Sequence, residues 1–578
     1  MQSGSTLVSD AQRNLRTSSS GLLVLAVGVG AAAAAFAVLF RWLIRTFTML
    51  LSGHPDYAAA PGTAHPGFPW LGPWFVVIAP VVAGLLYGPL VHLFAREARG
   101  HGVPEVMYAV ARRGGRIPPQ VAAVKALASA LCIGGGGSVG REGPIVQIGS
   151  AVGSTAGGLL RMPEARMRVL VACGAAGGIA ATFNAPLAGV FFAMELILAD
   201  FTTKSFGAVV VSSVTASVIA RAVLGDQPFL DLPAFHVQGV EEYLWFAVLG
   251  LLAGVIGTVF IRVLYGIEDL CDKVWRGPEW LRPAVGGVLL GGLLLVVPQM
   301  YGVGYPVLAN GVAGKYVIGF LVVLLVAKML ATSLTIGIGG SGGVFAPSLF
   351  IGAMLGAAFG QALSAWGPEP AGQAGAFALV GMGAVFAGAA RAPITAVIIM
   401  FELTNEYTII LPLMAAIVLS TAVSHALSRD TIYTAKLSRR GVDLQEPRAE
   451  TRLREAKARD VMQGLSSPVV AADTELASLA PALARSRHGV TAVTEADGRY
   501  AGVLTAHAVA DALSDGQHDA QRAIDLAEKP GAVSPDASLA EALQILESGL
   551  VNAVPVVDQD ARLVGWVTAQ DVLVSLRR

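Results

Sequence analysis

The sequence predicts an all-α polytopic membrane domain with broken helices, followed by a cytoplasmic α/β domain. Three observations predict this. The 578 residues are 54% hydrophobic and only 14% charged, far from the balance of a soluble protein. The apolar excess is confined to long stretches between residues 21 and 427, whereas residues 428–578 have the charge density of a soluble domain. Both parts also contain internal repeats, which indicate duplication.

Seven uninterrupted apolar segments are long enough to cross a bilayer as helices. They lie near residues 21–43, 73–95, 206–225, 242–268, 282–299, 316–335 and 408–427. Residues 118–200 and 336–404 are also apolar, but glycine and proline interrupt them repeatedly, which predicts short or broken helices. Irregular backbone at membrane depth is tolerated only where protein buries it or where it lines a polar cavity. A pathway is therefore expected in these two regions.

The two interrupted regions repeat each other. Aligning Pro144 with Pro347 gives the shared pattern GSxGxxxPxxxIGxxxG without a gap. A second pair of blocks begins at Gly174 and at Gly381, and both blocks have equal length and end on Glu-Leu. Paired segments of this kind point to a binding site at the interface of two repeats, near the middle of the membrane.

Charge and hydropathy predict how the parts are placed. The apolar run after the polar first twenty residues has no cleavage site for a signal peptidase, so we expect it to be retained as a first membrane helix. The segment from Arg429 to Arg459 is rich in lysine and arginine, which predicts a cytoplasmic tail. The expected parts are a cytoplasmic N-terminal segment 1–20, a membrane domain 21–440 with inverted repeats over about 21–230 and 240–440, a linker 441–456, and two tail motifs over 457–515 and 520–578.

Glycine-rich turns that open helices are the candidate binding elements. Such turns expose backbone N–H groups at the positive end of the helix dipole, which favours anions. Three turns place proline where a helix can begin: GHGVP from Gly100, GREGP from Gly140 and GVFAP from Gly343. A fourth candidate is the segment TIYTAKL around Tyr433.

These turns, in this order and within a repeat, resemble those of the CLC family of chloride channels and transporters. The resemblance continues through residues 177–195, 391–407 and 433, and it covers residues 20–440. It implies an integral protein of the cell membrane that forms a homodimer with one anion pathway per subunit. Chloride, other small anions and protons are the expected partners, and no cofactor is required for transport.

Within this resemblance, Glu142 is the expected gate. A carboxylate in an anion path is a tethered anion that competes with chloride for one site and leaves when it is protonated. The resemblance implies that the backbone of Arg141, Glu142 and Gly143 forms the site that this carboxylate occupies. Passage of anions would then depend on pH.

The resemblance also implies donors for a central ion. Val344 and Phe345 would offer backbone N–H groups, and Tyr433 would donate its phenol O–H from the inner side. Neutral donors replace hydration without trapping a conducted ion. His101 occupies the position where the family usually has serine, and its imidazole titrates near neutral pH. We therefore predict that His101 binds the anion and makes affinity or gating sensitive to acid, the alternative being a neutral donor that replaces serine.

A second departure follows Glu195. Proton-coupled members commonly have two adjacent glutamates there, the second being the internal proton acceptor, but this chain has Leu196. The sequence therefore favours channel-like or weakly coupled anion transport. The alternative is a chloride/proton antiporter that uses a non-standard internal proton path, with Glu195 as a candidate substitute acceptor.

The tail resembles a pair of cystathionine β-synthase (CBS) domains. The second motif ends in GWVTAQD, where Thr568 and Asp571 are candidates to hold the phosphate and ribose of an adenine nucleotide. The first motif keeps Gly502 and Thr505 but has Ala508 in place of the aspartate. One nucleotide site at most is expected, and a purely structural role in dimerisation is the alternative.

Other functional classes fit less well. The net charge is zero and basic residues form no phosphate-binding face, so no nucleic-acid partner is expected. The three cysteines lack metal-ligand spacing. The chain has no zinc protease, nucleophile-elbow or Walker motif, so it is not expected to be an enzyme. A cation transporter with a CBS tail is less consistent with breaks that are helix N-termini.

Overall fold

The computed structural model divides the chain into two compact units, Met1–Val442 and Asp443–Arg578, and each is described by itself. It describes Arg16 and residues 18–225, 241–366, 374–404, 407–443, 453–465, 469–486, 489–514, 522–529, 531–547 and 552–577. Most of the expected N-terminal segment 1–20 and of the expected linker 441–456 lies outside the described residues.

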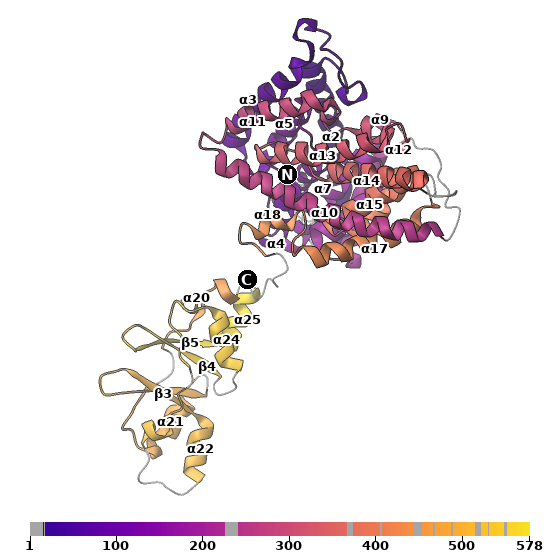
Figure 1. The fold of residues 1–578 in the computed structure, drawn as a ribbon. Coiled ribbons are helices and arrows are strands. Elements are labelled where there is room, and N and C mark those ends of the chain that lie inside the picture. Colours follow the sequence, from indigo (N-terminus) through magenta and orange to yellow (C-terminus); the bar gives the residue numbers. More distant parts are fainter. Residues whose placement is uncertain are drawn as a thin grey trace, which may run out of the picture. The chain divides into compact units, whose positions relative to one another are not determined.

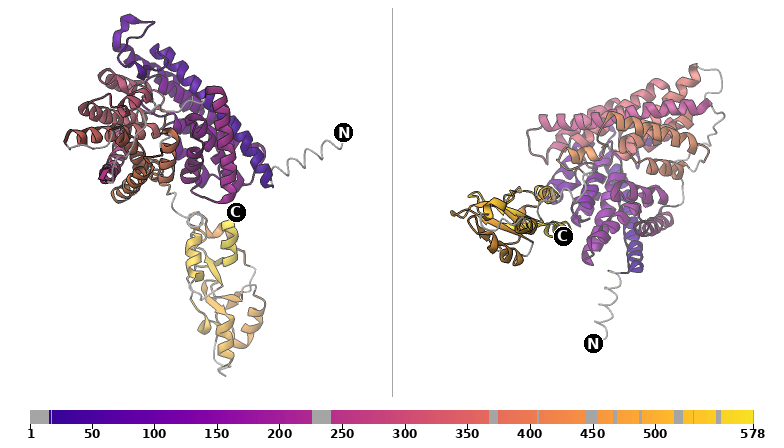
Figure 2. Two further views of the ribbon diagram at one scale, coloured as in Figure 1. Left: turned by 90° about the vertical axis from the view of Figure 1, so that its right-hand side faces the viewer. Right: turned by 90° about the horizontal axis from the view of Figure 1, so that it is seen from below.

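The first unit is built from two groups of helices, one from each half of the sequence, which adjoin in both views of Figure 2. The first half contains α2 (Ser19–Ser52), η1 (Tyr57–Ala59), η2 (Pro69–Trp74), α3 (Phe75–Phe94), η3 (Arg96–Ala98), α4 (Val103–Arg112), α5 (Gln120–Gly134), α6 (Glu142–Leu159), α7 (Glu164–Phe183), α8 (Pro186–Phe192), the π-helical η4 (Ala193–Leu198) and α9 (Thr203–Leu224) (Figure 1). The second half contains α10 (Glu241–Val274), α11 (Arg282–Val296), η5 (Pro298–Met300), α12 (Tyr305–Val312), α13 (Ile318–Gly337), α14 (Phe345–Trp366), α15 (Ala374–Ala390), α16 (Pro393–Thr404), α17 (Ile410–Leu427) and α18 (Thr434–Ser438).

The predicted membrane segments are confirmed as helices. Within the described ranges, eight helices have the length and composition to cross a membrane: α2, α3 with the preceding η2, α7, α9, α10, α13, α14 and α17. The interrupted regions are broken into several helices, as predicted, and two of these helices are long: α7 and α14 have 20 and 22 residues. Their glycines shape the loops between helices and the contacts between helix faces rather than shortening the helices.

Glycines also bring equivalent helices of the two repeats close together. A Cβ atom on Gly149 of α6 would lie 2.1 Å from the carbonyl oxygen of Gly174 in α7. In the second repeat, a Cβ atom on Gly352 of α14 would lie 2.3 Å from the carbonyl oxygen of Gly381 in α15. Small residues allow such approach of helix backbones within membranes. The helix pairs α6/α7 and α14/α15 are thus packed alike.

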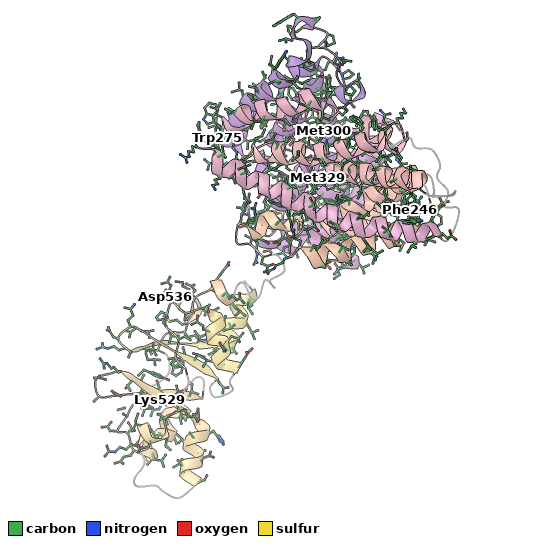
Figure 3. All side chains as sticks on the ribbon, viewed as in Figure 1. Phe246, Trp275, Met300, Met329, Lys529 and Asp536 are labelled. Carbon is green, nitrogen blue, oxygen red and sulfur yellow. The ribbon has the colours of Figure 1, made fainter. Side chains whose placement is uncertain are left out.

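Side chains fill the interior of this unit, as Figure 3 shows. Phe246 and Met300, both labelled there, have no exposed surface, and Met329 is 5% exposed. Apolar side chains on the outer faces of α9, α11 and α17, such as Val218, Leu289 and Val418, are instead largely exposed. An apolar exterior around a packed interior suits a lipid environment.

The second unit contains two small sheets with flanking helices (Figure 1). Its elements are α20 (Ala458–Val461), β1 (Val469–Ala471), η6 (Leu476–Ser478), α21 (Leu479–Ala484), β2 (Val490–Thr494), β3 (Tyr500–Thr505), α22 (Ala506–Ser514), α23 (Ala523–Leu526), α24 (Leu539–Glu547), β4 (Ala553–Val557), β5 (Leu563–Thr568) and α25 (Ala569–Arg577). Strand β2 pairs antiparallel with β3, and β4 pairs antiparallel with β5. Each motif contains a helix, two antiparallel strands and a second helix, as expected for an α/β tail, and in the first motif β1 also pairs parallel with β2.

Candidate anion site and gate

The three glycine-rich turns meet at one place. The backbone N–H of Gly140 donates to the carbonyl oxygen of Gly343 at 2.7 Å, and that of Gly343 donates back to Gly140 at 2.6 Å. The N–H of Gly100 donates to Gly340 at 3.0 Å. Turns that are far apart in the sequence are thereby joined by backbone hydrogen bonds, so α4, α6 and α14 begin near a common point.

Glycine is required where these turns touch. A Cβ atom on Gly143 would lie 2.1 Å from the carbonyl oxygen of His101, and one on Gly343 would lie 2.7 Å from the backbone nitrogen of Gly143. No larger residue fits without moving the backbone. The sequence-predicted residues Arg141, Gly143 and His101 are therefore neighbours of the turn that carries Val344 and Phe345.

The start of α14 is held by aromatic packing. Phe345 is the first residue of α14, and its ring packs against those of Phe183 and Phe386 at centroid distances of 5.6 and 4.5 Å. The first N–H groups of a helix have no partner within the helix. Those at the start of α14, which include Phe345, face the region where the three turns meet.

Tyr265 contacts both His101 and the residue that precedes Tyr433. The imidazole of His101 is fully buried, 6.1 Å from the ring of Tyr265 between centroids, and neither ring nitrogen has a hydrogen-bond partner among the described residues. The hydroxyl of Tyr265 donates to the carbonyl oxygen of Ile432 at 2.7 Å, directly before Tyr433. Tyr433 is itself 1% exposed. His101 and the backbone before Tyr433 are therefore both close to Tyr265.

Glu142 is the first residue of α6, and its carboxylate folds back over its own turn. It is 1% exposed. A Cβ atom on Gly140 would lie 2.1 Å from its Oε2 and 3.2 Å from the Cβ of Ala346, so the carboxylate lies beside the start of α14. Oε2 has no hydrogen-bond partner among the described residues, whereas Oε1 accepts a hydrogen bond from the hydroxyl of Tyr305. An acidic side chain thus occupies the place that the turns make favourable for anions.

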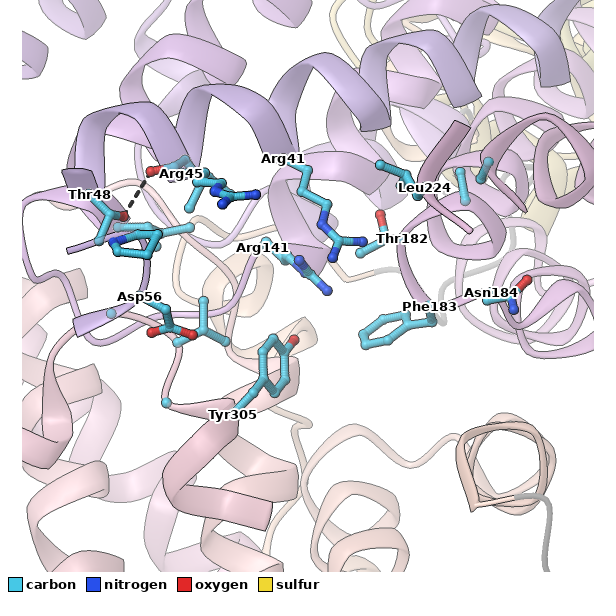
Figure 4. Close-up of a pocket in the computed structure, with 18 of the residues that line it drawn as sticks. Arg41, Arg45, Thr48, Asp56, Arg141, Thr182, Phe183, Asn184, Leu224 and Tyr305 are labelled. Atoms are coloured by element: carbon cyan, nitrogen blue, oxygen red, sulfur yellow. Dashed lines mark hydrogen bonds between the residues drawn. The ribbon is translucent and has the colours of Figure 1, made fainter. Parts of the chain in front are cut away.

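A cavity of about 490 Å³ is lined in part by Arg141 and Tyr305, two neighbours of Glu142 (Figure 4). Four arginines line it, together with Asp56 and Tyr305: Arg41, Arg45, Arg141 and Arg221. The guanidinium carbon of Arg141 lies 5.2 Å from the centre of the Tyr305 ring. A cleft lined by charges of mainly one sign concentrates ions of the opposite sign. This cavity therefore attracts anions toward Glu142.

Two buried lysines hold the turns in place. Lys125 Nζ donates to the carbonyl oxygens of Ala98 and Gly100 at 2.9 and 2.7 Å. Lys328 Nζ donates to Ser138 Oγ and to the carbonyl oxygen of Val303, each at 2.9 Å. In the described part of the chain, the hydrogen-bond partners of both lysines are carbonyl and hydroxyl groups. Each lysine side chain thus ends beside a loop of the candidate anion region.

Glu195 lies away from the gate, at an interface between the two repeats. Its Oε2 accepts hydrogen bonds from the backbone N–H and the hydroxyl of Thr395 at 2.8 and 2.7 Å, at the start of α16. In the equivalent position, Glu402 accepts from the backbone of Leu187 and Ala188 at the start of α8, at 2.9 and 2.6 Å. A glutamate from each repeat thus accepts hydrogen bonds from the first turn of a helix in the other repeat. These bonds give Glu195 a structural role, and Leu196 beside it is buried.

In the second unit, Thr568 and Asp571 cap α25. The carboxylate of Asp571 accepts from the backbone N–H and the hydroxyl of Thr568 at 2.9 and 2.6 Å, and from Nε2 of Gln463 at 2.9 Å. The first motif has only one part of this cap. Thr505 Oγ1 accepts a hydrogen bond from the N–H of Ala508, but alanine at position 508 has no carboxylate to accept a bond from Thr505. The asymmetry predicted between the motifs is therefore also present in their helix caps.

Sequence reasoning missed Tyr305. Its turn, GVGYP from Gly302, has the same spacing of glycines and proline as GHGVP from Gly100. Lys125 and Lys328 also match in the ungapped alignment that pairs Pro144 with Pro347. The matching turns and the matching lysines show that the repeat also includes the turns at residues 100–104 and 302–306. This match could have identified the turn that carries Tyr305.

Comparison with known proteins agrees with this arrangement. A sequence model of the family described as "Voltage gated chloride channel" matches residues 83–425, more than half of the chain, and a model of the CBS domain matches residues 524–578. The chain therefore belongs to the CLC family and carries a C-terminal CBS region, so it is an integral membrane transport protein and not an enzyme.

Two relatives illustrate the range of similarity. The chain is 34% identical over 422 residues to a ClcB-like chloride channel protein of Ralstonia nicotianae, an overlap that covers 72% of this chain and 97% of the relative. It is 38% identical over 360 residues to an H(+)/Cl(-) exchange transporter ClcA of Vibrio cholerae, covering 61% and 76%. A slow cyanobacterial Cl-/H+ antiporter has a similar structure, with a TM-score of 0.64, 26% identity and coverage of 74% and 98%.

Proposed function

We propose that the protein exchanges chloride for protons across the membrane, with Glu142 as the gate shared by both ions. The observation that supports this is a buried carboxylate at the meeting point of three helix N-termini, beside an arginine-lined cavity. The names of the relatives support exchange more than passive flow, because several are H(+)/Cl(-) exchange transporters. The antiporter reading of the sequence is therefore preferred to the channel-like one.

The proposed cycle uses one movable acid. When ionised, the Glu142 carboxylate occupies the anion site and blocks the path. Protonation removes its charge, so it leaves the helix N-termini and chloride takes its place. His101, the backbone at Val344 and Phe345, and Tyr433 then act as neutral donors to the ion, aided by the charges of the buried lysines.

The inner proton route differs from the usual one in this proposal. Leucine at position 196 cannot carry a proton, and the carboxylate of Glu195 is engaged by Thr395. Protons therefore reach Glu142 from the inside by another path, which predicts slow exchange. The second candidate function is a chloride channel, and Leu196 is the observation that favours it.

Reconstituted vesicles test this proposal. Under an outward chloride gradient, an exchanger drives protons inward against their own gradient, whereas a channel does not. Glu142→Gln is expected to retain chloride flux and to lose at least tenfold in coupled proton uptake, since the amide cannot ionise. Leu196→Glu restores an acid at the internal position and is expected to increase proton uptake. Absence of uphill proton movement in the unmodified protein would reject exchange in favour of a channel.

We also propose a homodimer with both termini in the cytoplasm, and regulation by an adenine nucleotide at the second CBS motif. The family resemblance and the basic segment after α17 support the first two. For the nucleotide, Oδ1 of Asp571 accepts a hydrogen bond only from Gln463 among the described residues. A carboxylate oxygen has capacity for a further donor, so a ribose hydroxyl fits there.

A further inference from the structure

We propose that Tyr305 is a positioning residue that latches the gate, holding the Glu142 carboxylate in the anion path through its phenol hydroxyl. This rests on the proposed role of Glu142 and assigns its outer control to α12. The hydroxyl of Tyr305 donates to Oε1 of Glu142, and Tyr305 also lines the outer cavity. A hydrogen bond to an ionised carboxylate is stronger than one between neutral groups. The closed gate is therefore stabilised from a second repeat.

The turn that presents Tyr305 is built to hold one conformation. Gly302 and Gly304 have φ angles of 67° and 90°, which a residue with a side chain adopts only with strain. Gly304 is the N-cap of α12, so Tyr305 projects from the first helical position. The ring is fixed further by the guanidinium of Arg141, which lies over it. Little conformational freedom is left to lose when the hydroxyl meets Glu142.

The side chain of Lys328 forms hydrogen bonds with both the turn before Tyr305 and the loop before Glu142. Lys328 Nζ donates to the carbonyl oxygens of Gly302 and Val303, in the turn before Tyr305, at 3.3 and 2.9 Å. The same atom donates to Ser138 Oγ at 2.9 Å, in the loop that leads to Glu142. The distance between the two loops is thus set by a buried group, and the hydrogen bond between Tyr305 and Glu142 closes the arrangement.

The internal repeat supports a functional role for this turn. Its counterpart, residues 100–104, has a glycine N-cap with a φ of 86° and is held by Lys125 through the carbonyl oxygen of Gly100. That turn brings His101 to the inner part of the anion region. By the inverted symmetry of the repeat, residues 302–306 approach the same pathway at its outer part. The residue that matches Tyr305 is Val103, which has no donor, so the latch belongs to the outer turn alone.

Other charged and titratable groups face Glu142 from several elements. Arg141 precedes it, Lys328 lies on α13, and Tyr433 precedes α18. The outer cavity adds the arginines of α2 and α9 and the carboxylate of Asp56. These groups act mainly through charge at a distance. The hydroxyl of Tyr305 is the side-chain donor that forms a hydrogen bond with the Glu142 carboxylate among the described residues.

Tyr305→Phe removes only this hydroxyl. Without it, the ionised carboxylate is held less firmly in the path and a proton displaces it more easily. Chloride efflux at pH 7.5 is expected to rise three- to tenfold, a range below the full strength of a hydrogen bond to a charged group. The pH at which efflux is half-activated is expected to move upward. A purely structural tyrosine would lower the amount of folded protein without moving this pH.

The experiment uses the full chain in liposomes, with chloride efflux measured from pH 4.5 to 8. Tyr301→Phe is the matched control, because Tyr301 is buried and lines the same cavity but donates to the carbonyl oxygen of Gly134 at 2.7 Å. Tyr305→Phe is expected to shift the profile and Tyr301→Phe to leave it in place. Tyr305→His, which retains a donor, is expected to recover part of the shift, and thermal melting verifies that each variant is folded.

The variant Glu142→Gln distinguishes a failure of the proposed latch at Tyr305 from a failure of the proposed gate at Glu142. In that background Tyr305→Phe is expected to have no further effect, because there is no carboxylate to hold. If Glu142→Gln abolishes the pH dependence but folded Tyr305→Phe matches the unmodified protein, the latch is wrong and the gate remains. If efflux is half-activated at the same pH in Glu142→Gln as in the unmodified protein, the proposed gate itself is wrong. An equal shift in Tyr301→Phe and Tyr305→Phe would also overturn the latch.

Discussion

The turns at residues 100–104 and 302–306 are two copies of one structural device with different chemistry. Both have a glycine N-cap with positive φ, a proline in the first turn of the helix, and a buried lysine bound to their carbonyl oxygens. The inner copy brings His101 to the anion region, and the outer copy brings Tyr305 to Glu142. Duplication preserved the scaffold, while single side chains gave each copy its role.

The largest expected effects come from removing the two lysines that support these copies. Lys125→Met and Lys328→Met each leave buried carbonyl oxygens without a donor, at a cost of about 1–3 kcal/mol for each oxygen. Both variants are expected to melt at lower temperature, as thermal unfolding in detergent would measure. Among folded molecules, Lys125→Met is expected to weaken chloride binding, and Lys328→Met to shift the pH profile of efflux, because Lys328 supports the gate.

Lys315→Met is the control for this pair. Lys315 is exposed and donates to Oδ1 of Asn310 at 3.0 Å, so its loss is expected to change neither melting temperature nor transport. If Lys125→Met and Lys328→Met altered chloride binding and the pH profile in the same way, the separation between an inner and an outer copy would be wrong.

A smaller effect is expected from His101→Ser in the inner copy. Serine also donates a hydrogen bond, so chloride binding is expected to persist within about threefold, less than the loss of a hydrogen bond would cause. The change of affinity between pH 7.5 and 5.5 is expected to shrink, because serine does not titrate. Isothermal calorimetry at both pH values measures this. The charged neighbours Lys125, Lys436 and Arg440 remain in the variant, and an unchanged pH dependence would show that His101 is only a neutral donor.

The smallest effect concerns the two CBS motifs, which form a second pair of unequal copies. Asp571→Ala removes the carboxylate that caps α25, and the unit is expected to lose about 1 kcal/mol of stability together with any thermal shift produced by ATP. Ala508→Asp supplies the missing carboxylate beside Thr505 and is expected to gain a few tenths of a kcal/mol up to about 1. Differential scanning fluorimetry with and without ATP measures both. A full ATP shift in Asp571→Ala would rule out this nucleotide site.

Patterns along the chain predicted much of the fold because they reflect local physics. Apolar length predicted the spanning helices, and the higher charge density of residues 428–578 predicted a separate soluble domain. The glycine pattern did not indicate how long α7 and α14 are, since their glycines serve close packing between helices, which depends on the partner helix. Strand β1 was missed because three residues are too short to give a period of their own.

The candidate site was predicted as a set of turns but not as a geometry. The motif around Glu142 and the resemblance that it carries identified the acid, and the glycine pattern explained why three turns can touch. Neither indicated that Tyr305 binds the carboxylate, or that Glu195 caps a helix of the other repeat. Both contacts join residues more than 150 positions apart.

The sequence by itself determined the class of protein, the duplication, the candidate gate residue and the asymmetry of the tail, because each depends on residue type and spacing over short distances. Only the tertiary structure decided which groups hydrogen-bond to the buried lysines, which acid is a helix cap, and which side chain contacts Glu142. Those outcomes depend on the inverted packing of two repeats, which brings loops from opposite halves of the chain within hydrogen-bonding distance.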